Sequence, residues 1–226
     1  QTADWNQGDP YNKFIPQIGG QNCLVGCTAT ATSIVMEYHR HPIQGQGTLP
    51  AFTTRSNSLY VPERPLGHKY DWNNMLDEYE YGQYNAAQAD AAATLCADVA
   101  IGLQSDFGTN STGAYASHIP ALLVDYFGYD KGAIHYDRYN FKNDQWASMI
   151  KSELDKKRPV LYTGFNNVSG HAFVLDGYTT NDYFSVNWGW GGYCNGYFLL
   201  DALEPQGSGL GGNDDHYNFY QGGVFG

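Results

Sequence analysis

The chain has 226 residues, with 23 acidic and 12 basic side chains and a formal net charge of −11. This length allows one sizeable core or two lobes that share a cleft. The negative charge argues against binding to nucleic acid or to anionic membrane surfaces, because both call for basic patches. No apolar run approaches the ~18 residues that a membrane span requires. The first residues lack a charged segment followed by an apolar one, so a signal peptide is either absent or already removed.

Residues 21–42, which read QNCLVGCTATATSIVMEYHRHP, form the first helix candidate. Cys27 follows a glycine at the head of a run of small and apolar residues, and Pro42 closes the run. Threonine is a poor helix former, so a helix here requires burial on most of its sides. A thiol at its N-terminus would lie in the positive end of the helix dipole, which favours the nucleophilic thiolate. Free cysteines are also often small core residues, and on this stretch alone that interpretation is the stronger one.

The other cysteines do not settle the question. The four in the chain are too few and too scattered for a disulfide scaffold, although one or two bridges stay open. Cys23 and Cys27, with His39 and His41, could also be considered as a zinc site. The spacing C-x3-C-x11-H-x-H misses the usual finger pattern, because the two histidines are only two positions apart. We therefore expect no metal and no cofactor.

The middle of the chain predicts helices and one long connection. Residues 44–69 carry prolines among glycine, serine and threonine, which indicates an irregular segment wrapped over the surface. A short helix is expected at about 71–81. A stronger one is expected at 85–103, where apolar residues recur at helical spacing and Asn85 can act as the N-cap. Cys96 falls on that apolar face, so we interpret it as a core residue.

Two more helices precede a change of pattern. Ser117 can cap a helix that stops at Gly128, and Asn143 or Asp144 can begin another that Pro159 ends. After Pro159, short runs rich in valine, tyrosine and phenylalanine alternate with turn residues, which indicates strands. These runs are residues 160–165, 172–178, 183–188 and 197–200. Helices followed by an antiparallel sheet predict an α+β fold.

The closing segment, residues 206–226, holds the glycine-rich run GSGLGGNDD followed by aromatic residues. No strand-to-helix context surrounds this run, and two aspartates end it. We therefore expect no phosphate-binding role for it.

If Cys27 is a nucleophile, it requires a base, which for cysteine is usually a histidine held by a third group. His39 and His41 lie at the far end of the expected Cys27 helix, roughly 18 Å away at about 1.5 Å per residue. His171 stands between Gly170 and the expected strand AFVLDGY. Its imidazole would therefore project from the start of a buried strand, although a structural histidine would also fit there.

Asn187 follows two strands later and begins the run NWGWGG. Its amide oxygen could accept a hydrogen bond from the imidazole, while the indoles of Trp188 and Trp190 shield that bond from water. Cysteine, histidine and asparagine in this chain order form the arrangement that cysteine peptidases use.

The motifs GCTATATSIVMEYHRHP, GHAFVLDGY, VNWGWGG and WNQGDPYN resemble the streptopain family of secreted bacterial cysteine peptidases. The similarity runs through essentially the whole chain. It implies a single papain-like domain over residues 1–226. A mainly helical part at about 20–157 would carry Cys27, and an antiparallel sheet part at about 158–226, with a contribution from the N-terminal segment, would carry His171. The active-site cleft would lie between them.

The resemblance also implies roles for individual residues. Cys27 matches the family's nucleophile and His171 its general base. Gln7 matches the glutamine that forms the oxyanion hole with the backbone N–H of Cys27. Asn187 and Trp188 match the pair that orients and covers the histidine. The residues that correspond to walls of the substrate cleft are Gly113, Ala114, Phe165, Ser169 and Gly170.

The activity that the resemblance implies is that of a cysteine endopeptidase, which cleaves polypeptides through a thioester acyl-enzyme and needs no cofactor. The family's members are made as secreted zymogens, so the chain would be the mature form, bound by its own propeptide before maturation. A catalytically inactive binding or adhesion module and a transferase or amidase are the alternatives. The intact set of Cys27, His171 and Gln7 favours the peptidase. Cys23 is a departure from streptopain, and it could pair with Cys194, compete for oxidation or do neither.

Overall fold

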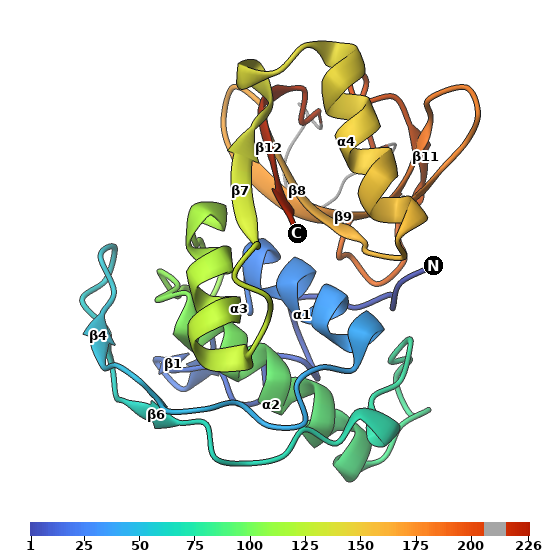
Figure 1. Cartoon of the computed structure of the whole chain (residues 1–226). Helices are drawn as coiled ribbons and strands as arrows, with labels where there is room; N and C mark the ends of the chain where they lie inside the picture. The colour runs from blue at the N-terminus through green and yellow to red at the C-terminus, as the bar shows by residue number, and fades with distance from the viewer. Residues whose placement is uncertain (206–215) are drawn as a thin grey trace.

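The computed structural model describes residues 1–205 and 216–226. Three helices gather on one side of the molecule, and a six-stranded sheet with a fourth helix forms the other side (Figure 1). The helices are α1 (Cys27–His39), α2 (Ala86–Gly102), α3 (Ile119–Phe127) and α4 (Asn143–Asp155). The α+β class expected from the sequence is confirmed. Within the described ranges, no helix has both the length and the apolar character needed to cross a bilayer.

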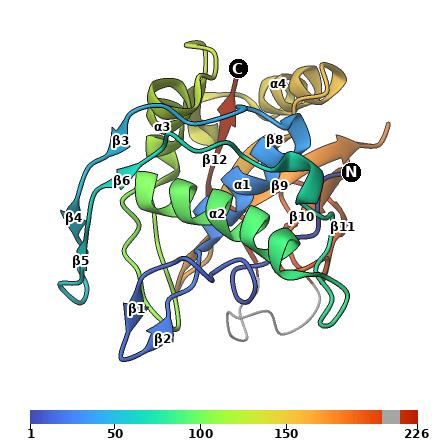
Figure 2. The ribbon, with the colours of Figure 1, turned by 90° about the horizontal axis from the view of Figure 1, so that it is seen from below.

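Helix α1 lies between α2 and the strands of the sheet (Figure 2). Ten of its 13 residues are buried, which explains how a threonine-rich sequence is held in a helix despite its low propensity. Its C-cap, Arg40, has a left-handed backbone conformation, so the helix ends before Pro42. The helix expected in residues 21–42 is therefore confirmed, with Cys27 as its first residue.

The remaining helices agree with the sequence except at some ends. Asn85 caps α2 through a capping box with Gln88, as expected. Gly128 ends α3 in the left-handed conformation that glycine adopts easily. The expected cap at Ser117 is wrong, because a 3-10 turn, η2 (Ala116–His118), precedes α3. The helix expected at 71–81 is reduced to the 3-10 turn η1 (Trp72–Asn74).

The main sheet is antiparallel, with the strand order β11-β10-β9-β8-β12-β7. Its members are β7 (Ile134–Asp137), β8 (Val160–Phe165), β9 (Gly170–Tyr178), β10 (Phe184–Asn187), β11 (Gly196–Phe198) and β12 (Phe219–Phe225). The four strands expected from the sequence are present with shifted ends. β7 and β12 were not predicted. The expectation for the glycine-rich run at 207–215 falls outside the described residues.

The connection at residues 44–69 is irregular for most of its length, but it contains two small antiparallel pairs. They join β3 (Thr48–Leu49) to β6 (Arg64–Pro65) and β4 (Phe52–Thr53) to β5 (Tyr60–Val61). A third pair, β1 (Gln17–Ile18) with β2 (Gln21–Asn22), precedes α1.

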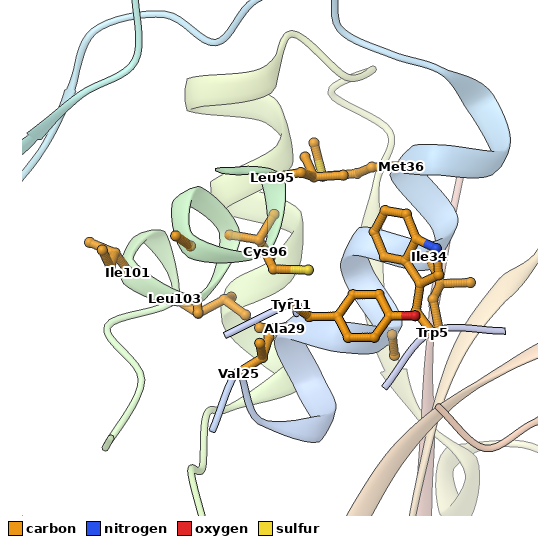
Figure 3. Close-up of a cluster of buried hydrophobic side chains, with 14 of the residues drawn as sticks. Trp5, Tyr11, Val25, Ala29, Ile34, Met36, Leu95, Cys96, Ile101 and Leu103 are labelled. Carbon is orange, nitrogen blue, oxygen red and sulfur yellow. The ribbon is translucent and has the colours of Figure 1, made fainter. Parts of the chain in front are cut away.

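Two hydrophobic cores lie on the two faces of the central strands. The first packs α1, α2 and the N-terminal segment together, with Trp5, Ile34 and Cys96 among its side chains (Figure 3). Cys96 is fully buried, which confirms its interpretation as a core residue. The second packs α4 on the opposite face of the sheet. Neighbouring residues of β9 alternate between them, since Val174 belongs to the first core and Phe173 to the second.

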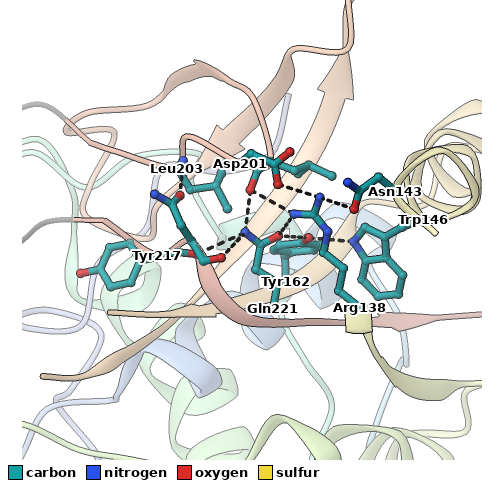
Figure 4. Close-up of polar contacts among 10 residues, drawn as sticks. Arg138, Asn143, Trp146, Tyr162, Asp201, Leu203, Tyr217 and Gln221 are labelled. Carbon is teal, nitrogen blue, oxygen red and sulfur yellow. Dashed lines mark hydrogen bonds and ion pairs between the residues drawn. The ribbon is translucent and has the colours of Figure 1, made fainter. Parts of the chain in front are cut away.

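A buried polar network holds β12 in its place between β8 and β7 (Figure 4). The Gln221 Oε1 accepts hydrogen bonds from Arg138 at 2.8 Å and from the Tyr162 hydroxyl at 2.5 Å. Its Nε2 donates to the Leu200 carbonyl at 2.6 Å. The Trp146 indole N–H donates to the same Tyr162 hydroxyl at 2.8 Å, so the network also holds α4 against the sheet.

Candidate active site

Cys27 begins α1, and a close approach between two segments fixes its position. Gly26, the N-cap, has φ 90°. A Cβ at this position would lie 2.8 Å from the Thr112 carbonyl oxygen, so only glycine fits. The Thr28 hydroxyl donates to the Ala114 carbonyl at 3.1 Å. The loop that contains Thr112 and Ala114 is thereby fixed to the start of the helix.

His171 reaches Cys27 from the other side of the molecule. It is the second residue of β9, where it lies opposite Gly164 of β8, and it is buried. Its imidazole and the backbone N–H of Ala172 lie near the Cys27 thiol, and both act on the pKa of that thiol. Helix α1 packs directly against β9, so the contact between the two elements aligns the pair.

The environment of Cys27 changes the acidity of its thiol. Burial raises the pKa of the thiol, because a thiolate loses solvation there. The hydrogen bond and the charge of His171, together with the Ala172 N–H, favour the thiolate more strongly and lower the pKa of Cys27 to about 7 from its usual 9.0. The thiol is therefore suited to act as a nucleophile near neutral pH.

The acceptor that holds His171 is a main-chain atom. The imidazole Nε2 donates to the Trp188 carbonyl oxygen at 2.7 Å. Because a carbonyl can only accept, Nε2 carries the proton, and Nδ1 is left to face the Cys27 thiol. Asn187 was expected to accept this hydrogen bond, but the expectation of a direct contact is wrong.

The Asn187 amide is occupied by other partners. Its Nδ2 donates to the Thr2 hydroxyl at 3.0 Å and to the Ala3 carbonyl at 2.8 Å. Its Oδ1 accepts from the Gly189 N–H at 3.0 Å. Asn187 therefore orders the turn that follows β10, and through this turn it acts on the carbonyl that holds His171.

Aromatic rings enclose the imidazole. Trp188 was expected to cover it, and its indole is stacked with the imidazole at 6.1 Å between ring centroids and an interplanar angle of 21°. The Trp190 indole is nearer, at 4.8 Å and 25°. Phe173 and Tyr217 lie at 5.8 and 5.2 Å. These rings restrict both the rotation of His171 and the access of water to its hydrogen bond with Trp188.

A cavity of about 640 Å³ opens over Cys27 and His171, and residues from both the helical side and the sheet side of the molecule form its walls. Of the expected cleft residues, Gly113, Ala114, Phe165 and Gly170 line it. Ser169 does not, because it lies in the turn between β8 and β9, where it exchanges hydrogen bonds with Asn166. Residues that the sequence did not indicate also line the cavity: Arg55, His135, Asp137, Thr163 and Tyr220. No local motif marks them, since the fold brings them together from four separate segments.

Gln7 lies beside the segment that leads into Cys27. Its carbonyl accepts a hydrogen bond from the Val25 N–H at 3.0 Å, two residues before the thiol, and the residue is buried. This places Gln7 next to the helix start, where a role in the oxyanion hole would require it.

Cys23 and the histidines at the end of α1 lie apart from this chemistry. Cys23 is fully buried as a free thiol, so the pairing with Cys194 is not formed, and burial raises the pKa of Cys23. His39 ends the helix that Cys27 begins. In residues 1–205 and 216–226, no group of three or more histidine, cysteine or acidic side chains could hold a metal ion.

Comparison with known proteins identifies the family. The model of the Peptidase C10 family matches residues 5–198, a span that includes Cys27, His171 and Trp188. The chain belongs to the Peptidase C10 family. It is 38% identical over 238 residues to streptopain of Streptococcus pyogenes, covering 98% of this chain and 59% of streptopain. It is 31% identical over 215 residues to the thiol protease/hemagglutinin PrtT of Porphyromonas gingivalis, covering 95% of this chain and 25% of PrtT.

Two similar solved structures show the same fold. The chain aligns with the active wild-type interpain A cysteine protease of Prevotella intermedia at a TM-score of 0.87 and 33% identity, over 99% of this chain and 93% of that one. It aligns with a prointerpain A fragment at a TM-score of 0.84 and 34% identity, over 99% of this chain and 70% of the fragment. The papain-like fold implied by the sequence motifs is therefore confirmed.

Proposed function

We propose that this C10 chain is a cysteine endopeptidase that hydrolyses peptide bonds of proteins through a thioester acyl-enzyme. The observation that carries the proposal is the Cys27 thiol itself. It stands at a helix N-terminus, beside a histidine that lowers its pKa, on the wall of a cavity about 640 Å³ in volume. Its relatives streptopain, PrtT and interpain A support the same activity.

We infer a route for each proton in this reaction. His171 Nδ1 takes the Cys27 proton and leaves a thiolate–imidazolium pair, while Nε2–H stays bonded to the Trp188 carbonyl. The thiolate attacks the substrate carbonyl carbon and forms a tetrahedral oxyanion. The imidazolium then protonates the leaving amine as the C–N bond breaks, which leaves a thioester on Cys27. His171 next takes a proton from water, the resulting hydroxide attacks the thioester, and the thiolate leaves.

The developing oxyanion requires donors that are already in place. We assign this role to the Cys27 backbone N–H, which is one of the unpaired amides of the first turn of α1, and to the Gln7 side chain. The position of Gln7 beside Val25 supports the assignment.

We also propose a longer, secreted precursor from which a propeptide is removed. The chain spans 59% of the length of streptopain, and the related prointerpain A fragment extends beyond the region that this chain covers. In the precursor, the propeptide would be the first polypeptide to bind in the cleft.

The test is site-selective alkylation followed by a proteolysis assay. Iodoacetamide at mildly acidic pH should label Cys27 and spare Cys23, and the labelled protein should no longer cleave casein. The Cys27→Ala variant, with an unchanged far-ultraviolet circular dichroism spectrum, should be inactive. Cleavage in heavy-oxygen water should place the label in the new carboxyl group, which distinguishes a hydrolase from a transferase. Equal labelling of Cys23, or proteolysis by the Cys27→Ala variant, would contradict the proposal.

A further inference from the structure

The N-terminal segment lies against the part of the sheet that holds the catalytic histidine. Figure 2 places the N-terminus beside β9 and β10. Thr2 is anchored there, because both its backbone N–H and its hydroxyl donate to Asp176 Oδ2 of β9, at 2.7 and 2.9 Å. Trp5 is anchored on the helical side of the molecule, where its indole N–H donates to the Leu76 carbonyl at 2.8 Å.

Residues 2–5 all make hydrogen bonds with residues 187–195. Thr2 and Ala3 accept from the Asn187 amide. The Trp5 carbonyl accepts from the Gly191 N–H at 2.9 Å. Asp4 lies between these contacts, and its Oδ1 accepts from the Asn195 Nδ2 at 2.8 Å. Four consecutive residues of the N-terminal segment therefore bind the loop at residues 187–195.

The contact between Asp4 and Asn195 is linked to His171 through the backbone of Trp188. While its Nδ2 donates to Asp4, Asn195 accepts the Trp188 N–H on its Oδ1 at 2.9 Å. The carbonyl of the same Trp188 residue accepts from His171 Nε2 at 2.7 Å. The N–H that bonds to Asn195 and the carbonyl that bonds to His171 both belong to Trp188. A backbone rotation that broke the Asn195 contact would therefore also move the carbonyl that holds the imidazole.

We propose that residues 2–5 are a positioning element of the active site, with Asp4 and Asn195 as the positioning residues that hold the Trp188 backbone and thereby orient His171 toward Cys27. The inference rests on the peptidase function proposed above. Neither residue contacts the reacting atoms, and both act through the turn.

The test depends on the direction of the hydrogen bond between the two side chains, in which Asn195 donates and Asp4 accepts. Asn195→Asp keeps an oxygen for the Trp188 N–H but places a second carboxylate against Asp4, where Asp77, Glu78 and Asp176 already add negative charge. The double variant Asp4→Asn/Asn195→Asp restores one donor facing one carboxylate with the direction reversed. Asn74→Asp is the matched control, because Asn74 makes the same kind of contact with Asp71, at 2.7 Å, away from the site.

Three readouts are compared in all variants: kcat/KM on a fluorogenic peptide, the pH midpoint of Cys27 alkylation, and the thermal midpoint of unfolding. Asn195→Asp should lower kcat/KM by roughly tenfold to a hundredfold, as expected for misplacing a reacting group by about 1 Å. It should also raise the alkylation midpoint, because a displaced imidazole favours the thiolate less. The double variant should recover both values, and the control should match the wild type.

A fall in thermal midpoint with an unchanged alkylation midpoint would overturn the proposal, since a purely structural contact behaves in that way. If Asn195→Asp does not fold, Asp4→Ala takes its place, with Asp4→Asn as the rescue whose amide oxygen can still accept. An Asp4→Ala protein with the alkylation midpoint of the wild type would equally overturn it. If the wild type cleaves no peptide, the proposed function fails, while the alkylation midpoints still decide on the positioning role.

Discussion

The imidazole of His171 is held by the main-chain carbonyl of Trp188, at 2.7 Å from Nε2 to oxygen. In the proposed catalytic group, the third member is therefore a backbone atom that every amino acid possesses. The Trp188 side chain contributes separately, by packing as one of the fully buried rings of the second core.

Trp188→Phe should consequently affect stability more than chemistry. The carbonyl remains, so we expect kcat/KM to stay within about tenfold of the wild type. The smaller ring leaves a void in a packed core, which should lower the free energy of unfolding by about 1–3 kcal/mol. Urea titration beside peptide hydrolysis measures the two effects. A loss of activity comparable to that of His171→Ala, with stability unchanged, would contradict this division.

The alkylation of Cys27 should titrate near neutrality. Because the pKa of Cys27 is lowered to about 7, its rate should rise through that pH as the thiolate forms and should level off above it. In His171→Ala, burial is no longer opposed by the imidazole, so the pKa should rise above the usual 9.0. Rates of iodoacetamide labelling across pH, followed by peptide mapping, report both midpoints. Identical midpoints in the two proteins would show that His171 does not activate the thiol.

Gln7→Ala should reduce turnover while leaving the thiol reactive. Loss of one oxyanion donor typically lowers kcat by about 10²- to 10³-fold. The alkylation midpoint of Cys27 should stay unchanged, since alkylation forms no oxyanion. Gln7→Glu provides a nearly isosteric comparison that replaces the donor with an acceptor. Full activity of Gln7→Ala would remove this residue from the oxyanion hole.

Gly26→Ala should damage both the fold and the site. The backbone at Gly26 has φ 90°, and a Cβ there would lie 2.8 Å from the Thr112 carbonyl oxygen. We expect a loss of more than about 1 kcal/mol in the free energy of unfolding and a lower kcat/KM, because the helix start that carries Cys27 must move. Gly67→Ala is the control, since a Cβ at Gly67 meets nothing within 4 Å. Equal effects of the two substitutions would contradict the steric argument.

A buried carboxylate on α2 predicts a pH-dependent contribution to stability. Asp98 accepts from Arg64 at 2.5 Å, from His68 at 2.7 Å and from the Tyr70 hydroxyl at 2.6 Å, which attaches the connection at 44–69 to the helix. The hydrogen bond to Asp98 raises the pKa of His68 above 6.5, against the opposing effect of burial. Because the folded pKa is the higher one, the stabilisation is complete below 6.5 and is lost as pH rises through the raised value.

The difference in free energy of unfolding between the wild type and His68→Gln should therefore shrink as pH rises. Urea titrations from about pH 5 to 9 measure it. Asp98→Asn should remove about 1–3 kcal/mol, because the hydrogen bonds to charged partners are weakened in a buried position. A difference between wild type and His68→Gln that is constant with pH would show that the histidine is not charged in this contact.

The sequence was sufficient for the parts of the site that side chains specify. Cys27 and His171 stand in motifs with distinctive neighbours, and the structure brings them together as expected. The acceptor at Trp188 could not be predicted, because a backbone carbonyl leaves no trace in residue identity. Asn187 was assigned to the right turn but to the wrong partner, since only the fold shows that residues 2 and 3 occupy its amide.

Some elements of the fold could likewise be predicted from the sequence and others could not. Helices with strong periodicity or capping signals, such as α2 with Asn85, were predicted closely. Strand β12 was not, because its glycines at 222 and 223 are typical of loops. Tertiary contacts require these glycines: a Cβ at 222 would meet the His135 ring at 2.9 Å. Burial and pairing thus decide the structure where local propensity is misleading.

The place of β12 in the sheet bears on how the protein is synthesised. Among the strands of this sheet β12 is the last in chain order, yet it pairs between β8 and β7, which precede it in the chain. Until it arrives, β8 has an open edge, and the sheet wall of the cleft lacks Tyr220. Cys27, by contrast, precedes every strand of the six-stranded sheet in the chain. A nascent chain therefore carries its nucleophile before it has the completed sheet that orients the base, so cleavage activity should appear only after β12 has been translated and has paired.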